Sequence, residues 1–118
     1  MGITYLEAKL SNPARPKYSA TVEFLVDTGA IYSVAPAPLL RKLGIAADRT
    51  EEFTLADGSH ARRRIGAAVF EIQGRRAPSP VIFGQPDDAT LLGAVSLEAL
   101  GLMIDPLKRQ LRPLPMLL

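Results

Sequence analysis

The stretch FLVDTGA, residues 24–30, is the most informative segment of this 118-residue chain. It places a carboxylate, a hydroxyl and a glycine directly after an apolar run, so Asp27 is predicted to leave a core strand and enter a tight turn. Gly29 permits such a turn and lets its backbone N–H approach the carboxylate closely. Ordinary turns also contain aspartate, which then bonds its own backbone. Taken alone, the stretch therefore supports two interpretations, a catalytic carboxylate and a plain turn.

The residues before Asp27 alternate between apolar and polar positions, which is typical of a half-buried β-strand. Within Ser19–Val26, Thr21 and Glu23 face one side. The apolar residues that share the other side are Ala20, Val22, Phe24 and Val26. The alternation therefore predicts that Asp27 stands at the end of a core strand.

Ten prolines and nine glycines are spread through the chain, which keeps regular elements short and favours a mostly β fold. Two short helices are predicted, Pro36–Leu43 and Ser96–Leu100, the second with Ser96 as its capping residue. Asp57-Gly58 predicts a two-residue hairpin turn. We expect one all-β domain over residues 1–118, a closed barrel or sandwich with one or two short helices. The predicted strands are Ile3–Leu10, Ser19–Val26, Phe53–Ala56, Ser59–Ile72, Pro80–Gly84, Thr90–Leu92, Leu102–Asp105 and Lys108–Leu111.

Composition excludes several classes of protein. Apolar residues make up 47% and charged residues 22% of the chain, so intrinsic disorder is not expected. No window approaches the ~20 apolar residues of a membrane span. The N-terminus does not resemble a signal peptide, so we expect a cytoplasmic protein with no membrane partner. Cysteine is absent and His60 is the single histidine, which excludes a His-rich zinc site within one chain, and no metal or cofactor is predicted.

The charge pattern argues against a nucleic-acid partner. A net charge of +2 makes the chain only mildly basic, and the absence of tryptophan leaves few stacking surfaces. The one charge run is Arg62-Arg63-Arg64, in which Arg62 and Arg64 share a face of a strand and Arg63 takes the other. We interpret this run as a solvated edge strand protected by charge. A small β-barrel that binds nucleic acid is one hypothesis for this chain, and these features disfavour it.

A second segment repeats the arrangement of apolar strand, glycine and short helix. Thr90-Leu91-Leu92-Gly93 is followed by the helix predicted to end before Gly101. A glycine such as Gly93 allows the backbone of a neighbouring loop to approach closely. A plain core strand and helix is the alternative interpretation.

Four features in this order and spacing together resemble the retroviral-type (retropepsin-like) aspartic proteases, specifically the small bacterial members of that clan. They are DTGA at 27–30 with Ser33 beyond it, a hairpin around 56–59, LLG at 91–93 with its helix, and the closing hairpin Leu102–Leu111. The resemblance covers roughly residues 19–114. Asp-Thr-Gly alone is a weak motif, whereas the four features in register are a strong one.

The resemblance implies an endopeptidase that acts on extended polypeptide segments. In this family two aspartates about 3 Å apart share one proton, so that one acts as acid and the other as base toward a water molecule. No cofactor or metal takes part. Because this chain contains one Asp-Thr-Gly, the resemblance implies a C2 homodimer with Asp27 of each subunit facing the axis.

The resemblance also implies roles for individual residues. Asp27 would be the catalytic carboxylate, and Thr28 would bond across the dimer axis beneath the pair. Gly29 would direct its N–H at the carboxylates and, with Ala30, line the path of the substrate. Gly93 would pack behind the active-site loop. The residues of a mobile flap that closes over the peptide would be Ala56, Asp57, Gly58 and Ser59.

The chain ends complete the implied assembly, since Ile3–Leu6 and Leu111–Leu118 would interleave as interface strands.

Two departures from the family pattern bear on activity. The flap tip Asp57-Gly58 is more polar than the glycine-rich tips of viral members, and Ala94 stands where several viral relatives carry an arginine. A catalytically weak or inactive module for dimerisation or peptide binding is therefore the second hypothesis.

Overall fold

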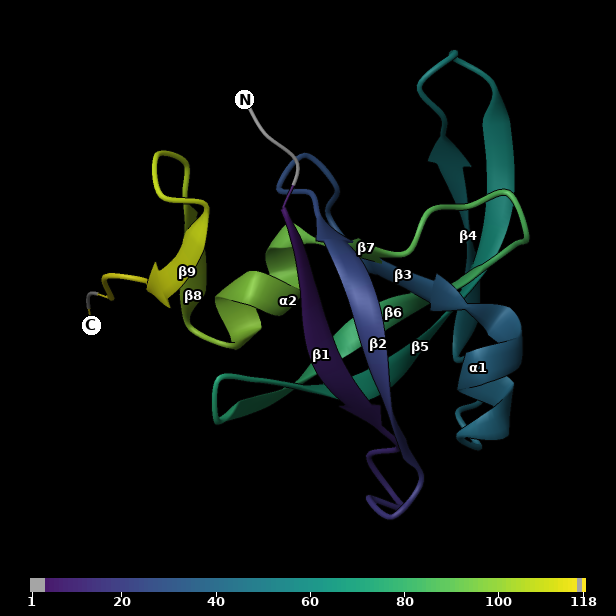
Figure 1. The fold of residues 1–118 in the computed structure, drawn as a ribbon. Helices are drawn as coiled ribbons and strands as arrows, with labels where there is room; N and C mark the ends of the chain where they lie inside the picture. Colours follow the sequence, from purple (N-terminus) through teal and green to yellow (C-terminus); the bar gives the residue numbers. More distant parts are fainter. Residues whose placement is uncertain (1–3, 117) are drawn as a thin grey trace.

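The computed structural model describes residues 4–116 and 118, and in these residues it contains nine strands and two short helices (Figure 1). Strands dominate because the chain alternates apolar and polar residues in short runs between turns. The elements are β1 (Tyr5–Ser11), β2 (Ser19–Val26), β3 (Ser33–Pro36), α1 (Ala37–Lys42), β4 (Arg49–Thr54), β5 (His60–Ile72), β6 (Arg75–Gly84), β7 (Leu91–Leu92), α2 (Ala94–Ala99), β8 (Leu102–Asp105) and β9 (Gln110–Pro113).

Seven strands form one sheet that closes on itself. Their order is β1-β2-β7-β3-β6-β5-β4, and an additional pairing of β1 with β5 closes the barrel. The pairs β2–β7 and β3–β6 are parallel, and the other pairs of this sheet are antiparallel. The expected closed, all-β fold with short helices is thus confirmed.

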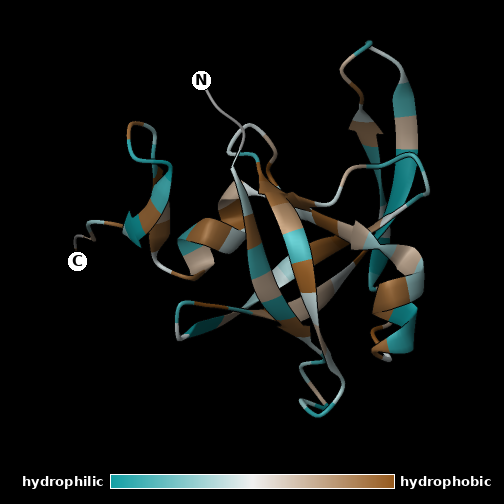
Figure 2. Ribbon diagram, in the orientation of Figure 1, coloured by the Kyte–Doolittle hydropathy of each residue, from teal (hydrophilic) through white to brown (hydrophobic). Residues whose placement is uncertain are grey.

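The interior of the barrel is filled by the apolar faces of these strands. Along β2, Phe24 is fully buried while Thr21 and Glu23 are exposed, as the alternation predicts. The rings of Phe24 and Phe70 lie 5.9 Å apart at their centroids. Figure 2 shows the alternation of polar and apolar residues along β1 and β2. The helices add Leu40 and Leu97 to the same core.

The hairpin that joins β4 to β5 differs from the predicted two-residue turn. Residues 55–59 connect the two strands. A two-residue turn of type I′ needs positive φ at both central residues, and Asp57 does not have it, whereas Gly58 does at +85°. Instead the Gly58 N–H donates to the Leu55 carbonyl (2.9 Å) and the Leu55 N–H to the Ser59 carbonyl (2.7 Å). The connection is therefore a three-residue turn that ends on a left-handed glycine.

Further expectations need correction. Three strands have other bounds than the expected Phe53–Ala56, Pro80–Gly84 and Lys108–Leu111, since they are observed at Arg49–Thr54, Arg75–Gly84 and Gln110–Pro113. The sequence did not predict β3, a strand of only four residues with a serine at its start. Ser96 was predicted to cap α2, but the helix begins at Ala94 after Gly93, with no side-chain cap. Ser96 instead lies inside the helix and is fully buried.

The last two strands form a separate two-stranded sheet, β8–β9. Figure 1 shows this hairpin standing to one side of the barrel, beyond α2. In the part of the chain that the structure describes, no helix is long and apolar enough to cross a membrane.

Candidate active site

The turn after β2 holds the carboxylate of Asp27 in a fixed geometry. The Asp27 N–H donates to the Leu92 carbonyl (3.0 Å), which ties the start of the turn to β7. The Gly29 N–H donates to Oδ1 of Asp27 (2.9 Å), and the Ala30 N–H donates to the Asp27 carbonyl (3.1 Å). Asp27 is half-buried, so its carboxylate is both oriented and accessible.

Gly29 leaves space in this turn beside the Asp27 carboxylate. Its φ lies outside the left-handed region, so other residues could adopt the same backbone conformation. A Cβ at this position would lie 3.2 Å from Oδ1 of Asp27. A side chain here would therefore crowd the carboxylate that the Gly29 N–H now binds.

A single peptide group supports the turn from behind. The carbonyl of the Leu92–Gly93 peptide accepts the Asp27 N–H, and its N–H donates to Oγ of Ser33 (2.9 Å). A Cβ on Gly93 would lie 2.7 Å from both the carbonyl carbon and the oxygen of Tyr32. These are backbone atoms that cannot move aside, so glycine is the residue that fits.

Three buried serines continue this support into the core. Oγ of Ser33 lies 2.5 Å from Oγ of Ser96, which lies 2.7 Å from Oγ of Ser79. Because Ser79 donates its single proton to the Pro80 carbonyl (3.2 Å), Ser96 must donate to Ser79 and Ser33 to Ser96. The Ser33 hydroxyl can then accept the Gly93 N–H, and each of the three serine hydroxyls has an acceptor for its proton. The sequence analysis missed this network, and the only local signal was polar residues inside otherwise apolar segments.

The residues predicted to form a flap lie on the β4–β5 hairpin, apart from the Asp27 turn. Figure 1 shows that the turn after β2 and this hairpin project from the same end of the barrel. At the hairpin tip, Oδ1 of Asp57 accepts the backbone N–H of Ser59 (2.9 Å) and its hydroxyl (2.5 Å). These two hydrogen bonds lower the pKa of Asp57. Asp57 is therefore held ionised within its own turn.

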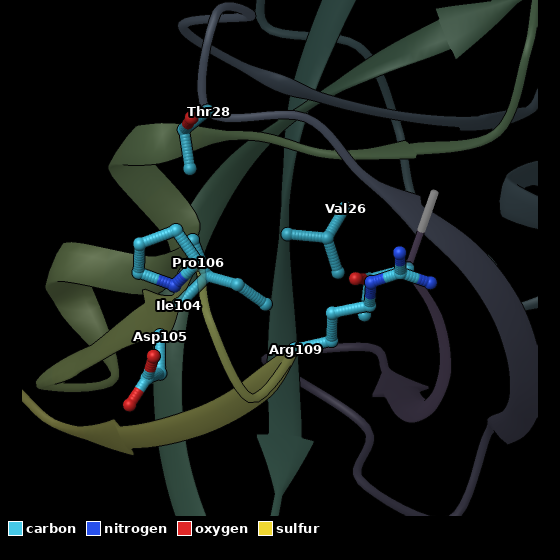
Figure 3. Close-up of a pocket in the computed structure, with 7 residues that line it drawn as sticks. Val26, Thr28, Ile104, Asp105, Pro106 and Arg109 are labelled. Atoms are coloured by element: carbon cyan, nitrogen blue, oxygen red, sulfur yellow. The ribbon is translucent and has the colours of Figure 1, made fainter. Parts of the chain in front are cut away.

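Thr28 points toward the β8–β9 hairpin (Figure 3). Its side chain lines a small cavity of about 90 Å³ between the end of β2 and that hairpin. Asp27 does not line this cavity. The other lining residues are Thr4, Val26, Ile104, Asp105, Pro106 and Arg109.

A larger groove of about 550 Å³ lies between the β3–α1 junction and the connection from β6 to β7. Its walls are mostly small and apolar, with Arg41 and Asp88 among the lining residues. Asp88 binds Arg63 of β5, which corrects the interpretation of the arginine run as wholly solvated.

Among the residues described, no group of three or more His, Asp or Glu side chains could hold a metal ion.

The comparison with protein families agrees with this geometry. Residues 14–95, which include the Asp27 turn, the β4–β5 hairpin and Gly93, match the model of the aspartyl protease family. This chain belongs to the aspartyl protease family. Among curated proteins, no sequence matches this chain significantly.

Solved structures show that this chain has the retropepsin-like fold. The protease of simian foamy virus (mac) is 20% identical with a TM-score of 0.56, over 80% of this chain and 92% of the viral one. A retropepsin-like aspartic protease from Rickettsia conorii is 23% identical with a TM-score of 0.55, over 88% of this chain and 77% of the bacterial one. At these identities the likeness concerns the fold.

Proposed function

We propose that this chain is an aspartic endopeptidase that cleaves extended polypeptide segments and that Asp27 is its catalytic carboxylate. One observation carries the proposal. Asp27 stands at the end of a core strand with its carboxylate bound by the Gly29 N–H, while β7 holds its backbone from behind. Membership of the aspartyl protease family supports peptide hydrolysis as the reaction.

One chain supplies half of the proposed site, so we propose a C2 homodimer in which each subunit contributes Asp27. Two features support this assembly. Ile31, which follows the Asp27 turn, is 67% exposed, and Leu107, in the connection between β8 and β9, is 92% exposed. The β8–β9 sheet packs on the core through Leu102 and Leu111 but exposes Leu107 at its connection, which favours a partner that covers this apolar side chain.

The expected interface strands can be placed in part. Ile3 and Leu117 lie outside the described residues. Tyr5 and Leu6 belong to β1 and pair with β2.

The proposed mechanism follows from two carboxylates held close together. They cannot both be ionised, so one keeps a proton. The ionised carboxylate takes a proton from a water molecule, whose oxygen attacks the scissile carbonyl carbon, and the protonated one donates to the carbonyl oxygen. The carboxyl that took the water proton then donates it to the amide nitrogen, the other carboxylate takes a proton from a hydroxyl of the gem-diol, and the C–N bond breaks as the carbonyl re-forms. The Gly29 N–H keeps its carboxylate oriented throughout.

The proposal is tested by comparing wild type with Asp27→Asn on a peptide library between acidic and neutral pH. New peptide termini are read by mass spectrometry, and sedimentation checks that both proteins have the same mass in solution. We expect cleavage by wild type only, because an amide cannot serve as the base. Cleavage by both proteins would move the chemistry to another residue. Cleavage by neither would favour a peptide-binding module.

A further inference from the structure

Arg63 is distinguished from its neighbours in the arginine run by a bidentate ion pair with Asp88. Nε of Arg63 lies 2.7 Å from Oδ2 of Asp88, and Nη2 lies 2.9 Å from Oδ1. The two side chains are 18% and 23% exposed. Arg62 and Arg64 are exposed, and within the described residues no ion pair involves either. Paired, charge-assisted bonds of this kind are among the stronger polar contacts in proteins.

Both partners of the pair are held by further hydrogen bonds. Oδ2 of Asp88 also accepts the Gln85 N–H (2.8 Å), and Nη1 of Arg63 donates to the Arg62 carbonyl (2.9 Å). The hydrogen bond with Asp88 raises the pKa of Arg63, and the same bond lowers the pKa of Asp88. The pair therefore joins two groups whose orientations are already fixed.

Arg63 lies on a part of the β4–β5 hairpin that overhangs the barrel. Residues 60–64 of β5 pair with β4, whereas the pairing of β5 with β6 begins at Ile65. A ribbon of two strands has little stability of its own. Figure 1 shows the ribbon rising beyond the barrel, with the connection from β6 to β7 reaching across to it. The Arg63–Asp88 pair joins these two segments.

Asp88 lies on the connection that leads directly to the candidate active site. This connection, residues 85–90, runs into β7, and the Leu92 carbonyl of β7 accepts the Asp27 N–H. It also forms one wall of the 550 Å³ groove. The pair therefore connects the overhanging hairpin to the segment that positions the Asp27 turn.

We propose that the Arg63–Asp88 pair is a tether that holds the β4–β5 hairpin against the 85–90 connection, and that both residues are positioning residues for substrate binding. The second half of this statement rests on the proposed protease function. A hairpin held in place before the substrate arrives loses less conformational freedom when the complex forms. Loss of the tether therefore weakens substrate binding more than it slows the chemical step.

The tether is tested first without reference to activity, by hydrogen exchange on the full chain. The variants are Arg63→Gln and Asp88→Asn, and the matched controls are the adjacent changes Arg64→Gln and Asp87→Asn. We expect amides of residues 50–63 to exchange about tenfold faster in the two tether variants only. Amides of residues 67–72 in the barrel serve as the internal reference, because a general loss of folding would accelerate those as well. Equal exchange in tether and control variants overturns the proposal.

A charge reversal keeps the test decisive where a single variant folds poorly. Arg63→Asp combined with Asp88→Arg places the same charges in exchanged positions. We expect the double variant to recover part of the protection that each reversal alone removes. If the barrel amides of the double variant are protected but its hairpin amides recover no protection, a direct pairing of residues 63 and 88 is contradicted.

Kinetics then test the positioning role. In Arg63→Gln and Asp88→Asn we expect KM to rise about tenfold with kcat within about twofold of wild type. Faster exchange with an unchanged KM would overturn the positioning role. Absence of cleavage by wild type itself would refute the proposed function, whereas the exchange data decide the tether in either case.

Discussion

At the scale of single residues, two glycines leave space that the candidate site uses, as the sequence predicts for the close approach of a neighbouring loop to Gly93. The turn after β2 needs space beside the Asp27 carboxylate, and Gly29 supplies it without a left-handed backbone. Gly93 allows the backbone of Tyr32 to lie where a side chain would otherwise be. Both requirements are steric, and both act on atoms within or directly behind the proposed catalytic loop.

The steric role of Gly29 predicts the outcome of Gly29→Val. A branched side chain whose Cβ lies about 3.2 Å from Oδ1 would push the carboxylate from its bond to the backbone N–H. We expect kcat to fall at least tenfold, corresponding to about 1.4 kcal/mol of lost transition-state stabilisation, with an unchanged far-UV circular dichroism spectrum. Steady-state kinetics on a peptide substrate measure the effect, and Thr21→Val, at an exposed position of β2, is the control. Full activity in Gly29→Val would show that the carboxylate does not need this contact.

At the scale of elements, local sequence patterns predicted the bounds of those strands whose ends are determined by their own residues and adjoining turns. The bounds of β2 and β8 are as predicted, because the alternation over Ser19–Val26 and the turn after Asp105 are local signals. The prediction failed where distant residues decide the environment. Ser96 is buried in α2 because hydroxyls from β3 and β6 surround it, and no local pattern reveals that. The Arg63–Asp88 pair joins residues 25 positions apart for the same reason.

The serine network that joins β3, α2 and β6 leads to a prediction for Ser96→Ala. The change removes the central hydroxyl, so the Ser33 hydroxyl loses its acceptor and Ser79 loses its donor in a buried site. We expect unfolding in urea to show a loss of about 1–3 kcal/mol in the free energy of unfolding. Ser19→Ala, at an exposed serine, is the control and should stay within about 0.5 kcal/mol of wild type. Equal stability of the two variants would show that the network contributes nothing net.

At the scale of the whole molecule, the barrel brings two exposed features to one end, the turn that carries Asp27 and the β4–β5 hairpin (Figure 1). The single chain has one Asp-Thr-Gly motif and a separate two-stranded sheet with an exposed Leu107 at its connection. The sequence predicted the fold and the candidate carboxylate, because both follow from short motifs in register. It could not predict the groove or the tether, because these arise only where separate elements meet.

The measurement that tests the shared site most directly is specific activity as a function of protein concentration, with the oligomeric state followed in parallel by sedimentation. If each subunit supplies one Asp27, activity per chain falls with dilution and follows the fraction of dimer, with the rate becoming second order in protein where monomers dominate. Asp27→Asn in excess should also reduce the activity of wild type, because mixed dimers hold one carboxylate in place of two. Constant activity per chain in solutions shown to contain only monomers would contradict a site formed by two subunits.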